Sequence, residues 1–463
     1  MKRAQRNAAA SRALTAHDNA ERPTSGRRLR WNLHSFFVKT FGCRASQADG
    51  AALETALSAR GLSCAGDAAG ADLVVLNTCT VTAAADDELR QTVRRIHRES
   101  PSARIVVTGC YAQRAPGEIA ALPGVWIVAG NSHKTQIPDL ISGAAPYHGQ
   151  VQVGDIFAQG DFLSSPVEDA LGDRTRPNLK IQDGCSNRCS FCIIPFVRGR
   201  SRSAPAEQAI EQVRRLAAKY KEIVLSGINL GRWGRDLPGR TRLSDLVRRM
   251  LDETPVERLR LSSVEPMDWS DDLLGLVASS PRIAKHVHAP LQSGSDRVLR
   301  RMHRKYRPRH YEDRILKARA WMPECAVGAD VMTGFPGETQ DEFEESRAFI
   351  ESLPFTYLHV FTYSERPGTK AAESADGVPP EVRKRRTHIL RDLGNRKNLE
   401  FRRTLVGRRL SAVTIQDGDV ALSDNYVKIS LAARRKPNQI EDIEVGGVDS
   451  SGLTEKGALT VFQ

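Results

Sequence analysis

Three cysteines near the middle of the chain have a spacing that suits a reactive metal centre. They are Cys185, Cys189 and Cys192 in the run IQDGCSNRCSFC, spaced as C-x3-C-x2-C. Three thiolates cannot complete a tetrahedral structural zinc site, and the motif contains no histidine or fourth cysteine. On a cubic 4Fe–4S cluster they would bind three irons and leave the fourth open to a cofactor. The spacing predicts such a catalytic cluster, with a zinc knuckle or buried thiols as the alternatives.

Three further cysteines each follow a β-type apolar run in the first third of the chain. The runs HSFFVKTFGC, ADLVVLNTC and ARIVVTGC end at Cys43, Cys79 and Cys110. Helix-like segments separate them, and this alternation predicts a parallel sheet. Because ligands bind at the carboxyl ends of parallel strands, we expect the three cysteines to converge on one ligand. Cys64 and Cys325 have no partners in the sequence and are expected to be packed, inert thiols.

A second strand–helix alternation runs from about residue 176 to 375. Its six candidate strands are NLKIQDG, KEIVLSG, RLRLSSVE, HVHAPLQ, VGADVMTGF and TYLHVFTYS. Six units fall short of the eight that close a full barrel, so we expect an open, partial (β/α)6 barrel. The C-x3-C-x2-C loop follows its first strand, where a barrel of this kind builds its site. From residue 404 onward, short β-branched runs predict a small all-β barrel or sandwich.

The fold class is therefore α/β, with an N-terminal parallel sheet domain, a central partial barrel and a small C-terminal all-β barrel. We expect a disordered basic extension over residues 1–33 and domains over residues 34–147, 171–402 and 403–463. Residues 132–173 are rich in Gly, Ala, Pro and Ser, and we interpret them as a connector.

The chain is basic, with a net charge of +13 and a pI near 9.5. Beyond the N-terminal extension, basic residues gather in RVLRRMHRKYRPRH, which contains Tyr306, and in a helical pattern over 381–403. Phosphate neutralisation and base stacking on an aromatic ring would suit RNA. No run approaches the roughly 18 apolar residues of a membrane span, and the start has no apolar core of a signal peptide. We therefore expect a cytoplasmic protein with no membrane partner.

The central triplet resembles that of the radical S-adenosylmethionine enzymes, and its surroundings resemble the methylthiotransferases within that superfamily. The N-terminal pieces FGCRASQADG, LNTCTVT and TGCYAQ are similar to those that hold a second 4Fe–4S cluster in this family. The resemblance covers roughly residues 35–463 and implies that Cys43, Cys79 and Cys110 are the auxiliary-cluster ligands. The family usually has Asn three residues after the first cysteine. This chain has Ser46 there, which keeps a hydrogen-bonding side chain. The C-terminal module resembles TRAM, a small RNA-binding barrel.

The resemblance also implies that the other barrel strand ends bind S-adenosylmethionine. Ordinary turns capped by polar groups are the alternative explanation for these Gly-rich strand ends. Phe191, between the last two cysteines, would pack on the adenine or shield the cluster from water. The residues expected to bind the cofactor are Ser226, Gly227, Asn229, Glu265, Gln292, Ser293, Asp330 and Phe191.

The family has three substrates: two modified adenosines beside the tRNA anticodon and a ribosomal protein aspartate. The runs QDGCSNRCSFCIIPFVRGRSRS and SGINLGRWGRD look most like the branch acting on N6-threonylcarbamoyladenosine, with N6-isopentenyladenosine as the alternative. The basic stretches fit the ribosomal branch less well. A non-catalytic, RNA-binding iron–sulfur sensor is the alternative from another class.

The mechanism that the resemblance implies uses both clusters. The catalytic cluster would reduce S-adenosylmethionine and release a 5′-deoxyadenosyl radical, which activates the adenine C2–H. The auxiliary cluster would supply or carry sulfur, which a second S-adenosylmethionine methylates. The implied partners are the tRNA anticodon stem-loop, modified at position 37, and a flavodoxin- or ferredoxin-like electron donor. The sequence does not indicate the sulfur donor.

Overall fold

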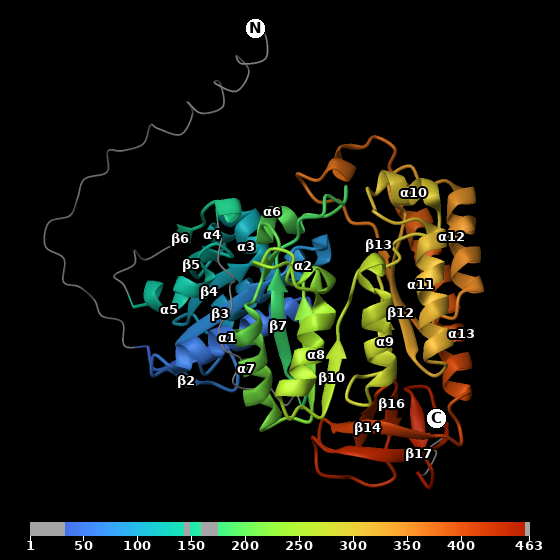
Figure 1. Ribbon diagram of the computed structural model, residues 1–463. Helices are drawn as coiled ribbons and strands as arrows, with labels where there is room; N and C mark the ends of the chain where they lie inside the picture. The colour runs from blue at the N-terminus through green and yellow to red at the C-terminus, as the bar shows by residue number, and fades with distance from the viewer. Residues whose placement is uncertain (1–32, 143–148, 159–174, 459–463) are drawn as a thin grey trace, which may run out of the picture.

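The computed structural model describes residues 33–142, 149–158 and 175–458, which form three packed domains (Figure 1). The predicted extension over residues 1–33 lies almost wholly outside the described residues, as do the predicted domain limits at 147 and 171. No helix among the described residues is long and apolar enough to cross a membrane.

The N-terminal domain is a six-stranded parallel sheet in the order β2-β1-β3-β4-β5-β6. Helix α1 (Arg44–Ser58) packs its apolar side chains on one face of the sheet, and α2 (Ala83–Glu99) packs on the other. A strand covered on both faces has a nearly continuous apolar sequence, and β3 and β5 are buried at every position. The strands are β1 Ser35–Thr40, β2 Ser63–Cys64, β3 Leu73–Thr78, β4 Arg104–Gly109, β5 Val125–Gly130 and β6 Gln150–Gln152.

The middle domain has the six predicted parallel strands, arranged as an open arc. Its backbone hydrogen bonding divides the arc into two sheets, β10-β9-β7-β8 and β11-β12-β13. The pairing of Leu259 with Ile283 and the bond from Ala284 N to Leu259 O (2.9 Å) span the division. The strands are β7 Asn178–Asp183, β8 Arg202–Ser203, β9 Glu222–Gly227, β10 Arg258–Leu261, β11 His286–His288, β12 Ala326–Thr333 and β13 Tyr357–Thr362. The partial (β/α)6 barrel is thus confirmed, with the short antiparallel β8 added at its edge.

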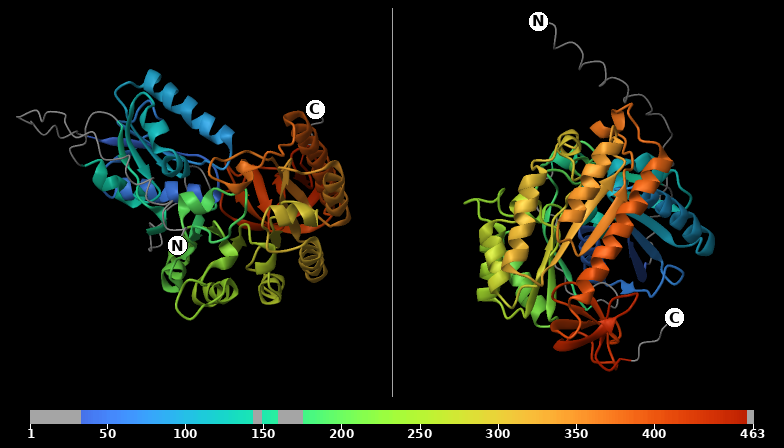
Figure 2. Two further views of the ribbon diagram at one scale, coloured as in Figure 1. Left: turned by 90° about the horizontal axis from the view of Figure 1, so that it is seen from above. Right: turned by 90° about the vertical axis from the view of Figure 1, so that its right-hand side faces the viewer.

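The helices of this domain lie on the outer side of the arc (Figure 2). Their apolar residues and the outward side chains of the strands form the largest core of the molecule. Thr339 begins one of them with a reciprocal cap, because its hydroxyl accepts from Glu342 N while the Glu342 carboxylate accepts from Thr339 N. The principal helices are α7 Ala206–Ala217, α8 Leu243–Glu253, α9 Asp271–Ser279, α10 Asp296–Arg301, α11 Pro308–Trp321, α12 Gln340–Ser352 and α13 Pro380–Arg403.

The N-terminal domain contacts both ends of the open arc. Helix α1 packs against β7 and β9 at one end. At the other end, beyond β13, Arg366 forms an ion pair of 2.7 Å with Asp86, and Ala83 N donates to Ser364 Oγ (3.1 Å). The N-terminal domain therefore spans the gap that six strands leave open, and Figure 2 shows it on that side of the arc.

The last domain is the predicted β barrel, closed in the order β14-β15-β16-β18-β17. It docks on the amino-terminal ends of the arc's strands, opposite the cysteine loop (Figure 1). The Tyr426 ring stacks on His286, with 4.5 Å between centroids, and Arg260 Nη2 donates to Ser423 O (2.9 Å). Its strands are β14 Arg409–Ile415, β15 Val420–Ser423, β16 Lys428–Ser430, β17 Ile440–Val448 and β18 Leu453–Glu455.

The interpretation of residues 132–173 as a connector is wrong in part. Strand β6 lies inside this segment and extends the N-terminal sheet by pairing with β5. Its sequence, QVQ, is half exposed at the sheet edge, so it has no apolar pattern that could have announced a strand. Backbone pairing with a buried neighbour defines it instead.

Candidate iron–sulfur and cofactor site

The loop that carries the central triplet is shaped by its backbone. Gly184 follows β7 with a φ of +67°, and a Cβ there would lie 2.0 Å from the carbonyl oxygen of Arg200. Only glycine fits this close approach. Cys185 N donates to Gly199 O (3.0 Å), and Cys192 N donates to Cys189 O (3.2 Å). The three thiols are thereby gathered on one loop at the carboxyl end of β7.

The electrostatics of this triplet suit a bound cation. Burial, followed by the neighbouring Cys189 and Cys185, raises the pKa of Cys192 to about 12. Burial also raises the pKa of Cys185. Two donors face the sulfurs: Arg304 Nη1 to Cys189 Sγ (3.3 Å) and Asn229 Nδ2 to Cys185 Sγ (3.7 Å). Thiols that disfavour each other's ionisation need a metal to become thiolates, so this donor set fits an iron–sulfur cluster.

The second triplet lies at one edge of the N-terminal sheet. Cys43 caps the start of α1, Cys79 follows β3 and Cys110 follows β4, and the three preceding strands are neighbours in the sheet. Burial, followed by Cys110 and Cys43, raises the pKa of Cys79 to about 12. The three sulfurs are therefore close enough to influence one another, and this donor set fits a cluster as well.

Gly42 makes room for this triplet. Its φ is +92°, and a Cβ built there would lie 2.5 Å from Cys79 Cβ and 2.8 Å from Cys79 Sγ. Cys110 of the same triplet is contacted by two side-chain donors: its Sγ accepts from Arg198 Nε (3.3 Å) and from Asn131 Nδ2 (3.6 Å). The second triplet thus has backbone close to Cys79 and side-chain donors at Cys110, while Cys43 is exposed.

Asn229 is the predicted cofactor residue whose surroundings best suit a ligand. Its backbone N–H donates to Gln182 Oε1 (2.6 Å), which fixes the turn after β9. Its side-chain Oδ1 is buried, and no hydrogen-bond partner for it lies among the described residues. An unsatisfied buried acceptor beside the central triplet suits a donor on a ligand, such as the ammonium group of S-adenosylmethionine. Of its neighbours, Ser226 donates to Leu179 O (3.4 Å), and Gly227 lies against the Gln182 side chain.

Glu265 is linked to the central triplet through Arg304. The Arg304 guanidinium donates to the Glu265 carboxylate (2.5 Å) and to Cys189, so the three groups form one chain. Burial raises the pKa of Glu265, and Arg304 opposes that rise.

The other rim residues have different surroundings. Gln292 has a φ of +65° and is held by backbone bonds to β12. The hydroxyl of Ser293 is directed to Ser346 on α12 (2.8 Å). Phe191 packs edge-on against Phe335.

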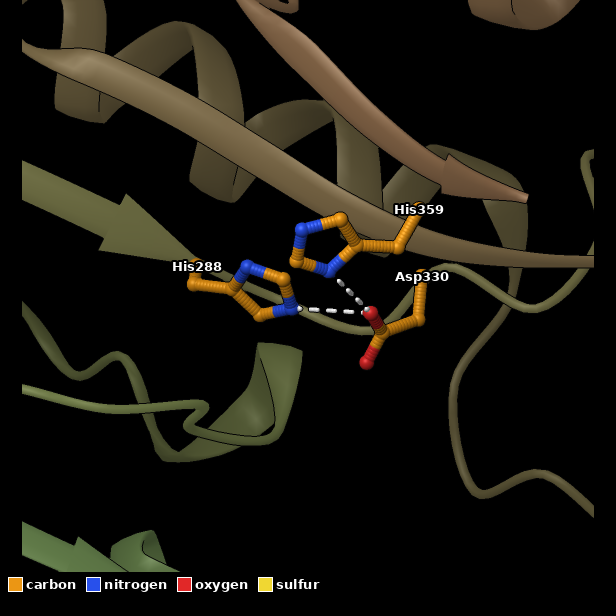
Figure 3. Close-up of side chains that lie close together, drawn as sticks. All are labelled: His288, Asp330 and His359. Atoms are coloured by element: carbon orange, nitrogen blue, oxygen red, sulfur yellow. Dashed lines mark hydrogen bonds and ion pairs between the residues drawn. The ribbon is translucent and has the colours of Figure 1, made fainter. Parts of the chain in front are cut away.

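Asp330 lies in a polar cluster inside the arc (Figure 3). Its Oδ1 is 3.2 Å from His288 Nε2 and 3.2 Å from His359 Nδ1. Burial alone would raise the pKa of Asp330, but the two histidines hold it well below its usual value. Tyr357 supports the cluster, with its hydroxyl 2.7 Å from His288 Nδ1.

The ligand atoms of these three residues lie within 4.8 Å of one another, close enough for a divalent cation. Hydrogen bonds engage both ring nitrogens of His288 and the Nδ1 of His359, so the same geometry also serves as a fixed anionic acceptor. The second carboxylate oxygen points away from both rings (Figure 3).

Two expectations drawn from the sequence are wrong. Cys64 is exposed, because it lies on the two-residue edge strand β2 instead of in a core, whereas Cys325 is buried as predicted. Tyr306 is 2% exposed, and its hydroxyl donates to the carbonyls of Pro290 and Leu291, so its ring is not free to stack on a base.

The two basic stretches are also largely engaged within the protein. In the first, Arg301 pairs with Glu342 (2.6 Å). In the second, Arg386 pairs with Glu338 (2.7 Å), while Arg402 donates to the carbonyl of Asp449 in the C-terminal barrel (2.8 Å). Arg304 and Arg386 are buried and several exposed basic residues have partners within the protein, which a charge count does not reveal.

Sequence reasoning did not single out Arg198 or the two histidines, and it assigned Arg304 to an RNA-binding run. Arg198 stands six residues after Cys192 in the quoted motif, and that proximity was a usable signal. His288 and His359 each stand next to apolar residues on a predicted strand, which was a weaker signal.

Comparison with known families agrees with this geometry. Residues 179–350 match the radical SAM superfamily, and residues 35–130 match a family described as uncharacterized protein family UPF0004. A solved structure of the radical S-adenosylmethionine methyltransferase TsrM from Kitasatospora setae, with cobalamin and a [4Fe-4S] cluster bound, shares the fold. Its TM-score is 0.53 at 17% identity, over 73% of this chain and 76% of that one. The fold and the match define a radical SAM protein.

Curated relatives narrow the class. The threonylcarbamoyladenosine tRNA methylthiotransferase MtaB of Aquifex aeolicus is 36% identical, over 84% of this chain and 95% of its own length. The protein of the same name from Bacillus subtilis is 40% identical, over 78% and 82%. A tRNA-2-methylthio-N(6)-dimethylallyladenosine synthase from Carboxydothermus hydrogenoformans is 31% identical, over 81% and 86%. This chain belongs to the radical SAM methylthiotransferase family, in the threonylcarbamoyladenosine tRNA methylthiotransferase branch.

Proposed function

We propose that this protein adds a methylthio group to C2 of N6-threonylcarbamoyladenosine at position 37 of tRNA, beside the anticodon. The observation that carries the proposal is the presence of two cysteine triplets, one at the carboxyl end of β7 and one at the edge of the N-terminal sheet. A radical enzyme needs the first, and insertion of sulfur calls for a second centre. The relatives of the threonylcarbamoyl branch support the choice of substrate.

An iron–sulfur cluster and S-adenosylmethionine are the cofactors of this family. We assign the cluster that binds S-adenosylmethionine to Cys185, Cys189 and Cys192. We assign a second, auxiliary 4Fe–4S cluster to Cys43, Cys79 and Cys110. When bound, the first would supply the electron that cleaves S-adenosylmethionine, and the second would supply or carry the sulfur.

The residues around the central triplet orient the cofactor and exclude water. The buried acceptor of Asn229 and the carboxylate of Glu265 provide groups for its ammonium and ribose donors, and Asp330 provides a fixed anion deeper in the arc. The N-terminal domain covers the open side of the arc and so shields the reacting groups from solvent. Gln292, Ser293, Ser226, Gly227 and Phe191 shape the rim.

The proposed partners are the tRNA anticodon stem-loop and a flavodoxin- or ferredoxin-like electron donor in the cytoplasm. We assign residues 34–147 to the auxiliary-cluster domain, 171–402 to the radical SAM core and 403–463 to a TRAM-like domain. Because much of the two basic stretches is paired internally, the exposed Arg and Lys of the C-terminal barrel are the better candidates for phosphate contacts, and Lys428 is one of them.

Three cysteine variants test the assignment of the two triplets in vitro. After anaerobic reconstitution and reduction, Cys189→Ala should lose formation of 5′-deoxyadenosine from S-adenosylmethionine and also lose methylthiolation of tRNA. Cys79→Ala should retain the cleavage and lose the methylthiolation. Cys64→Ala is the matched control, because this thiol is exposed on an edge strand, and it should behave like the parent protein. Cleavage by the Cys189→Ala protein would disprove the assignment of the central cluster.

Nucleoside mass spectrometry of tRNA from a deletion strain tests the substrate. The 2-methylthio derivative of threonylcarbamoyladenosine should disappear, and the parent gene should restore it while the Cys79→Ala gene should not. The 2-methylthio derivative of isopentenyladenosine should be unchanged. Loss of the isopentenyl derivative instead would move the protein to the other tRNA branch, and no change in either would overturn the proposed function.

A further inference from the structure

A group of five buried charged side chains lies where the N-terminal domain meets the radical SAM core. Arg198, at the end of α6 (Ile194–Arg198), is 2% exposed although it carries a full positive charge. Asp49 and Lys134 come from the N-terminal domain, whereas Lys180 and Asp183 come from β7. All five are buried.

The carboxylates of this group each bind more than one cation. Asp49 pairs with Lys134 (2.8 Å), Lys180 (2.5 Å) and Arg198 (3.0 Å). Asp183 pairs with Lys180 (2.8 Å) and with Arg198 (2.9 Å). Every pair that joins Asp49 to Lys180 or Arg198 crosses the boundary between the two domains.

The charges in this group do not cancel. Among the described residues, the ion pairs of this group set two carboxylates against three cations, so the group holds one more cation than carboxylate. An uncompensated buried charge is costly unless a counter-charge lies close by. A cysteine sulfur of the second triplet is placed to supply one, because Arg198 Nε donates to Cys110 Sγ (3.3 Å).

Arg198 also reaches a second cysteine of the same triplet through Ser46. Its Nη2 donates to Ser46 Oγ (3.3 Å), and Ser46 Oγ lies 3.6 Å from Cys43 Sγ. Since the hydroxyl accepts from Arg198, its own proton is free to point at the sulfur. The serine that departs from the family's usual asparagine is therefore the bridge between the guanidinium and Cys43.

We propose that Arg198 is a positioning residue of the auxiliary cluster, which it orients through Cys110 and Ser46 and stabilises electrostatically from the radical SAM core. The inference rests on the proposed function, because it takes Cys43, Cys79 and Cys110 as the cluster's ligands. Arg198 follows Cys192 by six residues, so one short segment holds a ligand of the first cluster and a support of the second. A cation and N–H donors beside cluster sulfurs favour the reduced, more negative state and so raise the reduction potential.

The test uses the full chain with Cys185, Cys189 and Cys192 replaced by Ala, so that only auxiliary iron remains. Iron and acid-labile sulfide per chain are measured after reconstitution, followed by a redox titration monitored by electron paramagnetic resonance. Arg198→Met should move the midpoint potential to more negative values and alter the spectrum of the reduced cluster. Arg198→Lys keeps the charge but loses the several N–H donors of the guanidinium, so its midpoint potential should lie between those of Arg198→Met and the parent.

Two further variants keep the result decisive. Ser46→Ala removes a single hydroxyl and should shift the potential in the same direction by a smaller amount, even if Arg198→Met does not hold iron. Arg260→Met is the matched control, since Arg260 is a fully buried arginine that pairs with Glu222, and it should leave the potential unchanged. Unchanged potentials and spectra in the Arg198 and Ser46 variants would overturn the inference. A parent chain without auxiliary iron would instead refute the proposed function.

Discussion

Replacing Gly42 by alanine should remove the proposed auxiliary cluster and leave the proposed site of the central triplet intact. The added Cβ would lie 2.5 Å from Cys79 Cβ, roughly 0.9 Å closer than an ordinary van der Waals contact. A metal site tolerates ligand displacements of only about 0.2 Å, so a shift of this size takes Cys79 out of bonding range. The left-handed φ of +92° adds about 1–2 kcal/mol, and the overlap adds about 1–3 kcal/mol.

Gly61 provides the matched control for this substitution. Its φ of +85° imposes a similar backbone cost, but a Cβ there meets nothing within 4 Å. In the background without the three central cysteines, the G61A protein should bind as much iron as the parent, and the G42A protein should bind almost none. With the central cysteines present, G42A should still produce 5′-deoxyadenosine. Equal iron in the two alanine variants would refute the steric argument and the placement of Cys79 as a ligand.

Three other outcomes are expected. Burial alone would raise the pKa of Glu222, but Arg260 and two other arginines lower it to about 2, from about 4.5 in the unfolded chain. The ionised carboxylate therefore stabilises the fold fully above pH 4.5. About 3 kcal/mol of the free energy of unfolding should be lost as the pH falls from 4.5 to 2. Denaturant titrations of the parent and Glu222→Gln should show this loss only in the parent, and parallel curves would contradict it. Asp330→Asn should raise the KM for S-adenosylmethionine or tRNA about tenfold, as expected for a lost charged hydrogen bond, and should also lower the free energy of unfolding, because the two histidines favour the ionised carboxylate. An unchanged KM for both would remove Asp330 from the site. Tyr426→Ala should cost about 3 kcal/mol by removing the ring stacked on His286, and limited proteolysis should then release the C-terminal barrel faster.

The arrangement of strands could be predicted because period and burial agree along most of the chain. Val74, Leu76 and their neighbours form continuous apolar runs, and such runs separated by amphipathic helices leave few alternatives to parallel sheets. Strand β5 is an apolar run of the same kind, VWIVAG, although it was not among the predicted strands. The position of both cysteine triplets at strand ends followed from the same pattern.

Contacts between the domains could not be predicted from the sequence. Nothing in the residues around Tyr426 predicts that its ring stacks on His286, because the two are 140 residues apart and the contact depends on how two barrels dock. The prediction that the two basic stretches present their charge to RNA was weakened for a related reason. Arg304 and Arg386 are counted as surface charge in a sequence, yet each is buried against a carboxylate supplied by a distant segment. Charge composition reports neither partner nor burial.

The buried charges between the first two domains are better explained by orientation than by stability. Removing five charged groups from water offsets most of their mutual attraction, so an apolar interface of the same size would hold the domains together at least as firmly. Apolar contacts, however, tolerate sliding, whereas bonds of 2.5–3.0 Å from Asp49 and Asp183 to Lys134, Lys180 and Arg198 fix distance and angle at once. In the proposed function, transfer of sulfur from one centre to a substrate activated at another requires such a fixed separation. An interface of directional bonds meets that requirement. Loss of any single partner would leave a buried charge unpaired and should therefore change the geometry around the second triplet.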